Sequence, residues 1–158
     1  MAGRFSGEGG PFHTFAEIRS DGAHWTGKVE LVEEKLMEPL RWRKPRRVFV
    51  NSMSDLFHEN LETWAIHRVF RVMALTPHIT YQVLTKRASR MRDVMQASPW
   101  GQAPLPNVWL GVSVENQEYA DKRIPDLLAT PAAVRFVSYE PALGAVDWKP
   151  YFAKPGIH

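Results

Sequence analysis

Four segments of the chain repeat one pattern: a run of apolar, β-branched and aromatic residues, a short polar tail, and then an amphipathic helical segment. The runs begin about 30 residues apart, which is the length of one strand–helix unit. Nearly continuous apolar runs, without strict alternation, are typical of strands buried on both faces of a parallel sheet. The repeat therefore predicts an α/β fold in which parallel strands alternate with helices. The four expected strands cover residues 47–52, 80–85, 107–114 and 134–139.

Helix start and stop signals lie between the expected strands. Asn60 is the expected N-cap of the first helix, and Pro77 follows the end of that helix. The second helix is centred on residues 91–95, whose methionines we interpret as packing residues. The third helix begins near Asn116, and Pro125 is expected to break it or to begin a second short turn.

The two ends of the chain are less regular than its middle. Residues 1–27 hold six glycines, which favours a long loop or an incomplete element. A short strand over 28–32 and a helix over 33–37 are expected to follow. Residues 141–158 are rich in proline, and no closing helix is expected there. We therefore expect residues 1–158 to form a single partial domain, cut from a larger one at both ends.

A polar tail follows each expected strand, and the carboxyl ends of parallel strands meet at one rim of the sheet. Ligands of parallel α/β folds bind at that rim, where the connecting loops vary without disturbing the core. Carboxylates, amides, hydroxyls and two cations suit a polar small molecule or a nucleotide. No catalytic residue is assigned. The candidate binding residues are Asn51, Ser52, Asp55, Lys86, Arg87, Ser113, Glu115, Asn116 and Glu140.

Each candidate also has a purely structural interpretation, which the sequence leaves open. The amides, the hydroxyls and Asp55 can cap helices or close turns. Lys86 and Arg87 can pair with Glu115 or Glu140 across neighbouring strand ends and so hold the rim together.

The chain contains no cysteine, which excludes disulfides, thiolate nucleophiles and cysteine-held zinc or iron–sulfur clusters within it. His58 and His67 lack metal-ligand spacing, and no dinucleotide-binding, P-loop or nucleophile-elbow motif occurs. We therefore expect no metal site. There is neither an apolar run of about 20 residues nor a signal-peptide segment, so no membrane contact and a cytoplasmic location are expected.

A basic segment covers residues 41–47 and contributes much of the net charge of +3. Such a segment can contact phosphates, with Trp42 free to stack on a base, and it can equally be a solvated connection. A nucleic-acid-binding module is therefore a rival function, and nucleic acid a candidate partner.

Four ordered blocks of the sequence resemble a family of unknown function found in phages, prophages and bacteria, which is often called the three-cysteine-motif family. That family is similar to radical S-adenosylmethionine proteins. Residues 1–5 also resemble the helix that follows its cysteine loop, and residues 156–158 resemble the lead into its next strand. The blocks cover residues 39–58, 82–87, 107–115 and 135–141. One departure is Tyr139, where many members have a small residue or cysteine.

The resemblance implies a partial (βα) barrel of the radical S-adenosylmethionine type. In the full-length family, three upstream cysteines would hold a 4Fe–4S cluster that binds and cleaves S-adenosylmethionine. This cysteine-free chain would then be a fragment of an enzyme of unknown substrate, inactive alone and without a cofactor of its own. Ser113, Glu115 and Asn116 are the candidates to contact S-adenosylmethionine, and Lys86 and Arg87 to contact its carboxylate or a substrate phosphate. A remnant without activity is a further alternative, and its exposed half-barrel edges should make it aggregate or dimerise.

Overall fold

A four-stranded parallel sheet forms the centre of the molecule, with its strands in sequential order β3-β4-β5-β6. The computed structural model describes residues 15–52 and 54–152. Each predicted strand is confirmed, with boundaries within two residues of the prediction. The strands are β3 (Arg46–Val50), β4 (Ile79–Thr85), β5 (Val108–Ser113) and β6 (Val134–Ser138), and the helices that connect them are α2 (Thr63–Leu75), α3 (Ala88–Ala97) and α4 (Gln117–Ala129).

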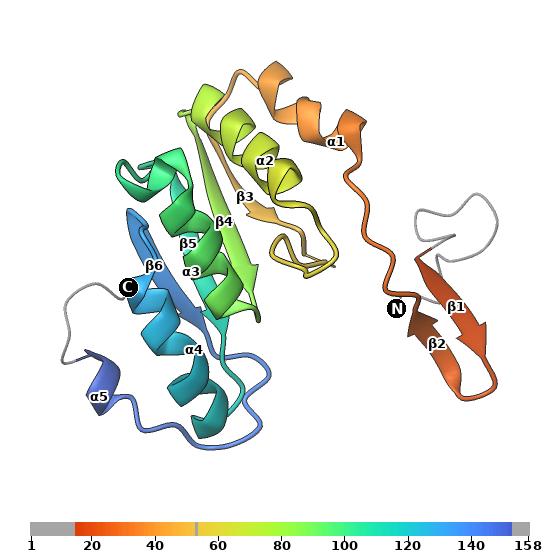
Figure 1. The fold of residues 1–158 in the computed structure, drawn as a ribbon, viewed down its shortest axis with the longest axis vertical. Helices are drawn as coiled ribbons and strands as arrows, with labels where there is room; N and C mark the ends of the chain where they lie inside the picture. The colour runs from red at the N-terminus through yellow and green to blue at the C-terminus, as the bar shows by residue number, and fades with distance from the viewer. Residues whose placement is uncertain (1–14, 53, 153–158) are drawn as a thin grey trace.

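The connecting helices α2, α3 and α4 all lie on one face of the sheet (Figure 1). Successive strands are neighbours, and parallel crossovers share one hand, so each helix returns over the same face. Burial along β4 alternates accordingly. Ile79, Tyr81 and Val83 are buried against the helices, whereas Gln82 and Leu84 on the other face are only half-buried.

The opposite face of the sheet carries no helix among the described residues, and the prediction of strands buried on both faces is confirmed only for β5, where Gly111 and Ser113 on this face are buried as well as Leu110 and Val112. The register places Phe49, Gln82, Trp109 and Val134 side by side on this face. Phe49 is 47% exposed. The strands read as continuous apolar runs because apolar side chains occupy both of their faces. Only one of these faces has a helical layer among the described residues.

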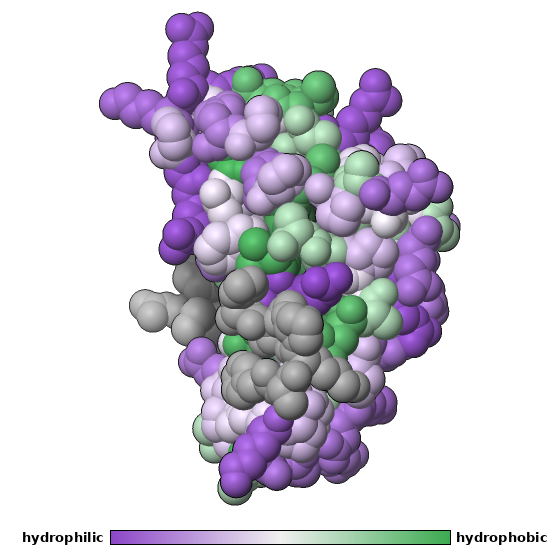
Figure 2. All heavy atoms as spheres, turned by 90° about the vertical axis from the view of Figure 1, so that its left-hand side faces the viewer, coloured by the Kyte–Doolittle hydropathy of each residue, from purple (hydrophilic) through white to green (hydrophobic). Residues whose placement is uncertain are grey.

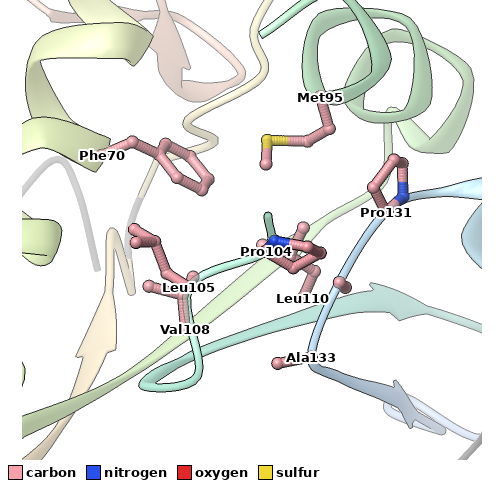
Figure 3. A pocket seen from close by; sticks show the side chains of 9 residues that line it. Phe70, Met95, Pro104, Leu105, Val108, Leu110, Pro131 and Ala133 are labelled. Atoms are coloured by element: carbon pink, nitrogen blue, oxygen red, sulfur yellow. The ribbon is translucent and has the colours of Figure 1, made fainter. Parts of the chain in front are cut away.

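The core between the sheet and the helices is closely packed. Phe70 of α2 and Met95 of α3 point toward Leu110 of β5 and the segment before that strand (Figure 3). A small apolar void of about 10 Å³ lies between them, which is roughly the space for one water molecule. The complete burial of Ile66 and Phe70 on α2 confirms that the first helical segment is amphipathic.

Two helix predictions are wrong in detail. The N-cap of α2 is Glu62, because the side chain of Asn60 instead donates a hydrogen bond of 3.0 Å to the carbonyl oxygen of Gly27. Helix α4 continues through Pro125 to Ala129. Ile124 and Leu127 on either side of this proline are completely buried, and their packing holds the helix together although the proline lacks an amide hydrogen.

The amino-terminal region differs from the expected loop, because β1 (Ala16–Arg19) and β2 (Gly22–Trp25) form an antiparallel hairpin. The expected strand over 28–32 is not formed, whereas the helix over 33–37 is confirmed as α1 (Glu33–Met37), followed by the 3-10 helix η2 (Glu38–Arg41). Helix α1 lies beside α2, where Glu33 accepts a hydrogen bond of 2.6 Å from Arg68 (Figure 1).

Two short helices complete the described part of the chain. They are η3 (Pro99–Gly101) and α5 (Lys149–Phe152), the latter in a region where no helix was predicted. The expected terminal elements at 1–5 and 156–158 lie outside the described residues. Within residues 15–52 and 54–152, none of the helices combines the length and the apolar character needed to cross a bilayer.

Candidate functional site

A hollow of about 1190 Å³ opens at the carboxyl ends of β3, β4 and β5 and extends along β3 toward α1. It brings together six of the nine candidate residues, from three different strand ends. They are Asn51, Ser52, Asp55, Lys86, Arg87 and Ser113. Glu115, Asn116 and Glu140 do not line the hollow, and Glu140 is exposed beyond β6.

The carboxylate of Asp55 ties the loop after β3 to the end of β4. It accepts hydrogen bonds from the hydroxyl of Thr85 at 2.7 and 2.9 Å and from the backbone nitrogen of Lys86 at 3.2 Å. It also accepts from the backbone nitrogen of Phe57 and from Arg87 Nη1, both at 2.9 Å. With so many donors satisfied within the protein, Asp55 positions the rim rather than facing a ligand.

Arg87 is held between two carboxylates. Its Nη1 lies 2.9 Å from Asp55, and its Nε lies 2.8 Å from Glu59. A backbone hydrogen bond and the side-chain hydrogen bond from Arg87 lower the pKa of Glu59 below its usual range. The guanidinium is therefore already neutralised by its neighbours.

Glu115 is the buried centre of a second group of charges. Its carboxylate forms ion pairs with Lys86 Nζ at 2.6 Å and with Arg123 Nη1 at 2.8 Å. The side chain of Glu115 is 5% exposed, whereas that of Lys86 is 55% exposed. Burial by itself raises the pKa of Glu115, but the hydrogen bond from Lys86 and the charge of Arg123 outweigh burial, and the pKa lies below its usual range.

The structural interpretation of several candidates therefore holds in this molecule. Lys86 pairs with Glu115, as one alternative predicted, while Arg87 pairs with Asp55 and Glu59 rather than with Glu115 or Glu140. The side chain of Asn116 caps α4 by accepting a hydrogen bond of 3.1 Å from the backbone nitrogen of Tyr119.

The side chains that remain directed at solvent lie at the mouth of the hollow. Asn51 and Ser52 are exposed in the turn after β3, where Asn51 adopts a positive φ of 58°, a conformation that asparagine tolerates better than most residues. Lys86 has three ammonium donors, and Glu115 is its one ion-pair partner among the described residues. Ser113 is buried and lines the wall of the hollow behind these residues.

A family model described as a protein of unknown function (DUF5131) matches residues 1–151. The chain belongs to this family. The match spans the whole sheet, the hollow and the segment that follows β6. No curated protein and no solved structure matches this DUF5131 protein.

Arg123 is the residue of the DUF5131 site that the sequence interpretation missed. Its Nη1 donates to the carbonyl oxygen of Ser113 at 2.7 Å as well as to Glu115, and its guanidinium lies 4.2 Å from the ring centre of Tyr119. The signal was present in the sequence, because Arg123 interrupts the apolar stripe that Ala120 and Ile124 form on α4. A charge on the buried face of a helix needs a buried partner.

The basic segment 41–47 lies at the amino end of β3, at the opposite end of the sheet from the hollow's polar mouth. None of its five cations forms an ion pair within the described part of the chain; they are Arg41, Arg43, Lys44, Arg46 and Arg47. Trp42 differs from the expectation, because it is half-buried against the core and the guanidinium of Arg46 lies 4.5 Å from its ring centre. This ring is not free to stack on a base.

Within residues 15–52 and 54–152, no group of three histidine, cysteine, aspartate or glutamate side chains is placed to hold a metal ion.

Proposed function

We propose that the polar mouth of the hollow binds S-adenosylmethionine, and that this chain supplies four strand–helix units of a barrel of the radical S-adenosylmethionine type. The observation that carries the proposal is the position of Lys86. Its ammonium group is fixed at the mouth by the buried carboxylate of Glu115 and keeps donors directed at solvent.

The barrel interpretation is supported by the way the sheet is wound. Four parallel strands follow one another in sequential order, and the connecting helices cover one face. A doubly wound sheet reverses its strand order and carries helices on both faces, whereas a barrel keeps one order and one helical layer. In a barrel, the open face with Phe49 and Trp109 becomes the interior.

The chemistry of the mouth suits the two ends of S-adenosylmethionine. The amino-acid carboxylate of this ligand matches the ammonium group of Lys86, since charge-assisted hydrogen bonds are the stronger ones. The amide of Asn51 and the hydroxyls of Ser52 and Ser113 can both donate and accept, as a ribose and an adenine require.

The iron–sulfur cluster implied by the resemblance does not fit the residues of this chain. The sequence has no cysteine, and the described residues hold no alternative set of three metal ligands. The proposal for this chain is therefore binding of S-adenosylmethionine, and no radical step is assigned to its residues.

Calorimetric titration of the purified chain with S-adenosylmethionine tests the proposal. We expect saturable binding that Lys86→Met weakens by about 10- to 100-fold, the range that one charge-assisted hydrogen bond represents. The matched control is Lys122→Met, which removes an exposed lysine of α4 that does not line the hollow and should leave binding unchanged.

Methylthioadenosine, which lacks the amino-acid carboxylate, sharpens the assignment. It should bind the original chain and the Lys86→Met variant equally. The proposal is wrong if S-adenosylmethionine gives no saturable signal, or if the two lysine variants bind it alike.

A second candidate function is nucleic-acid binding through the basic segment 41–47. The observation in its favour is that these five cations lack ion-pair partners among the described residues. Phosphate contacts give a steep dependence of affinity on salt concentration. Binding of single-stranded DNA, measured at two salt concentrations, should therefore fall strongly at the higher one, and Arg43→Gln with Lys44→Gln should flatten that dependence. A flat response in the original chain would remove this candidate.

A further inference from the structure

The loop between β3 and α2 places a histidine, His58, among the residues that line the hollow. The backbone of this residue is fixed from both sides. Its nitrogen donates to the carbonyl oxygen of Asp55 at 3.1 Å, and its own carbonyl oxygen accepts from the backbone nitrogen of Leu61 at 3.0 Å. The same carbonyl accepts a hydrogen bond of 2.5 Å from Arg90 Nη1. Because Arg90 belongs to α3, the loop is tied to the next helix of the layer.

The imidazole ring of His58 is held in one orientation and one tautomer. Its Nδ1 accepts a hydrogen bond of 3.1 Å from the backbone nitrogen of Asn60. A ring nitrogen that accepts carries no proton, so the proton of the neutral ring is on Nε2. The carboxylate of Glu59 lies 3.7 Å from Nδ1, which is too far for a hydrogen bond. His58 is therefore a neutral ring with a fixed N–H donor at Nε2.

The Nε2 donor of His58 has no hydrogen-bond partner among the described residues. The side chain is 25% exposed. The one buried side-chain nitrogen or oxygen that lacks a partner in the described part of the chain is Nε2 of His67, so Nε2 of His58 is accessible rather than enclosed. An accessible donor on a side chain that lines a hollow is available to a ligand.

The hollow belongs to the β3 side of the molecule. Figure 1 shows β3 and β6 at opposite edges of the sheet, and Figure 2 looks at the β6 side, where hydrophilic and apolar residues are intermixed. Residues of β3, β4 and β5 line the hollow, and none of β6 does. A ligand therefore reaches His58 at the β3 side of the rim.

His58 and Lys86 belong to different parts of this rim. Lys86 follows β4, and the carboxylate of Glu115, beyond the end of β5, holds its ammonium group. His58 lies in the loop after β3, and its neighbour Glu59 contacts Arg87 Nε at 2.8 Å. In the sheet β4 separates β3 from β5, and two strand spacings are about 10 Å. An extended ligand is needed to reach both donors.

We propose that His58 donates its Nε2 hydrogen to the nucleoside end of this ligand, while Lys86 binds the amino-acid carboxylate. This assignment rests on the proposed binding of S-adenosylmethionine at the mouth. The acceptors of that ligand lie at its two ends, because the sulfonium between them is positively charged. A neutral imidazole N–H suits the uncharged ribose oxygens and adenine nitrogens, whereas an ammonium group suits the carboxylate.

Two substitutions separate the two ring nitrogens of His58. His58→Asn keeps a side-chain amide near the position of Nδ1, where it can accept from the backbone of Asn60, but it removes the donor at Nε2. His58→Gln keeps a donor near the position of Nε2. Calorimetric titration with methylthioadenosine, which has the nucleoside but no carboxylate, should show about 2- to 10-fold weaker binding to His58→Asn, the range of one neutral hydrogen bond. His58→Gln should recover most of this loss.

Nitrogen NMR of the histidine rings tests the same assignment in the original chain, whatever the stability of the variants. We expect the ring of His58, identified by the signals that His58→Asn lacks, to carry its proton on Nε2 and to shift when methylthioadenosine is added. The matched control is His78, whose Nε2 donates to the backbone oxygen of Trp42 at 2.7 Å and which does not line the hollow. Its signals should not move.

The inference is overturned if methylthioadenosine does not bind, if His58→Asn binds it as tightly as the original chain, or if the proton lies on Nδ1. Equal shifts of His58 and His78 would have the same meaning. The proposed function fails separately. If S-adenosylmethionine binds and Lys86→Met weakens it while His58→Asn has no effect, only the role of His58 is wrong. If His58→Asn weakens both ligands while Lys86→Met has no effect, the role of Lys86 is wrong and that of His58 stands.

Discussion

The guanidinium of Arg123 lies 2.8 Å from the carboxylate of Glu115, and both side chains are almost completely buried. This pair connects helix α4 to the end of β5, and through Glu115 it holds Lys86 at the mouth of the hollow. The site is therefore built on a charge pair inside the protein rather than on its surface.

Removing the negative charge of this pair should destabilise the fold. Glu115→Gln leaves Arg123 buried without a counter-charge, and breaking a buried pair in this way costs about 3–5 kcal/mol. Lys86→Met removes only the half-exposed partner and should cost about 0–1 kcal/mol. Urea unfolding of both variants measures the difference, and equal losses would contradict the buried-pair interpretation.

The same pair makes stability depend on acid. The pKa of Glu115 is lower in the folded chain than in the unfolded chain, so its stabilisation is present above the unfolded pKa of about 4.3 and is lost as pH falls through the folded pKa. At neutral pH the original chain should be more stable than Glu115→Gln, and this difference in the free energy of unfolding should shrink as the pH falls into the acidic range. If the gap between them stays constant, the assignment of the acid effect to Glu115 fails.

A second pH dependence is expected at alkaline pH. Burial, followed by the hydrogen bond to the carboxylate of Asp121, raises the pKa of Tyr151 to about 12. The unfolded tyrosine ionises at about 10, so this contribution is present below pH 10 and is lost as pH rises toward 12. Tyr151→Phe should abolish that part of the alkaline loss. Burial also raises the pKa of Tyr81, so tyrosinate absorption should show late-titrating groups in the original chain and one fewer of them in the variant.

Asp55 should matter for stability more than its half-buried position suggests. Asp55→Ala removes the acceptor for Thr85, Arg87 and two backbone amides, and each buried donor left unpaired costs about 1–3 kcal/mol. We expect a loss of at least about 2 kcal/mol by urea unfolding. Asp93→Ala removes an exposed partner of Arg92 and should change stability by less than about 1 kcal/mol.

Gly111 is needed because the ring of Phe136 lies directly over it. A Cβ atom at this position would come within 2.5 Å of that ring. Gly111→Ala should therefore cost about 1–3 kcal/mol through overpacking. Phe136→Leu should relieve part of this cost, so the double variant should be more stable than the sum of the single changes predicts. Additive losses would show that the two residues do not contact.

The sequence by itself determined the repeating strand–helix units, the parallel class of the sheet and the polar character of the strand ends. Apolar runs and helix stripes are local properties, and a polar tail after each strand lies at the same rim in any parallel sheet. These features predicted that Asn51, Lys86 and Ser113 would come together, and the hollow contains all three.

Only the tertiary structure decided which polar groups face one another and which face of the sheet stays open. Continuous apolar strands are compatible with helices on both faces, and the choice depends on the order in which the strands are joined. The pairing of Arg87 with Asp55 and of Glu115 with Arg123 joins residues that lie on different elements. Spacing along the chain does not encode such contacts, because they arise where neighbouring strand ends and the helix packed against them meet in space.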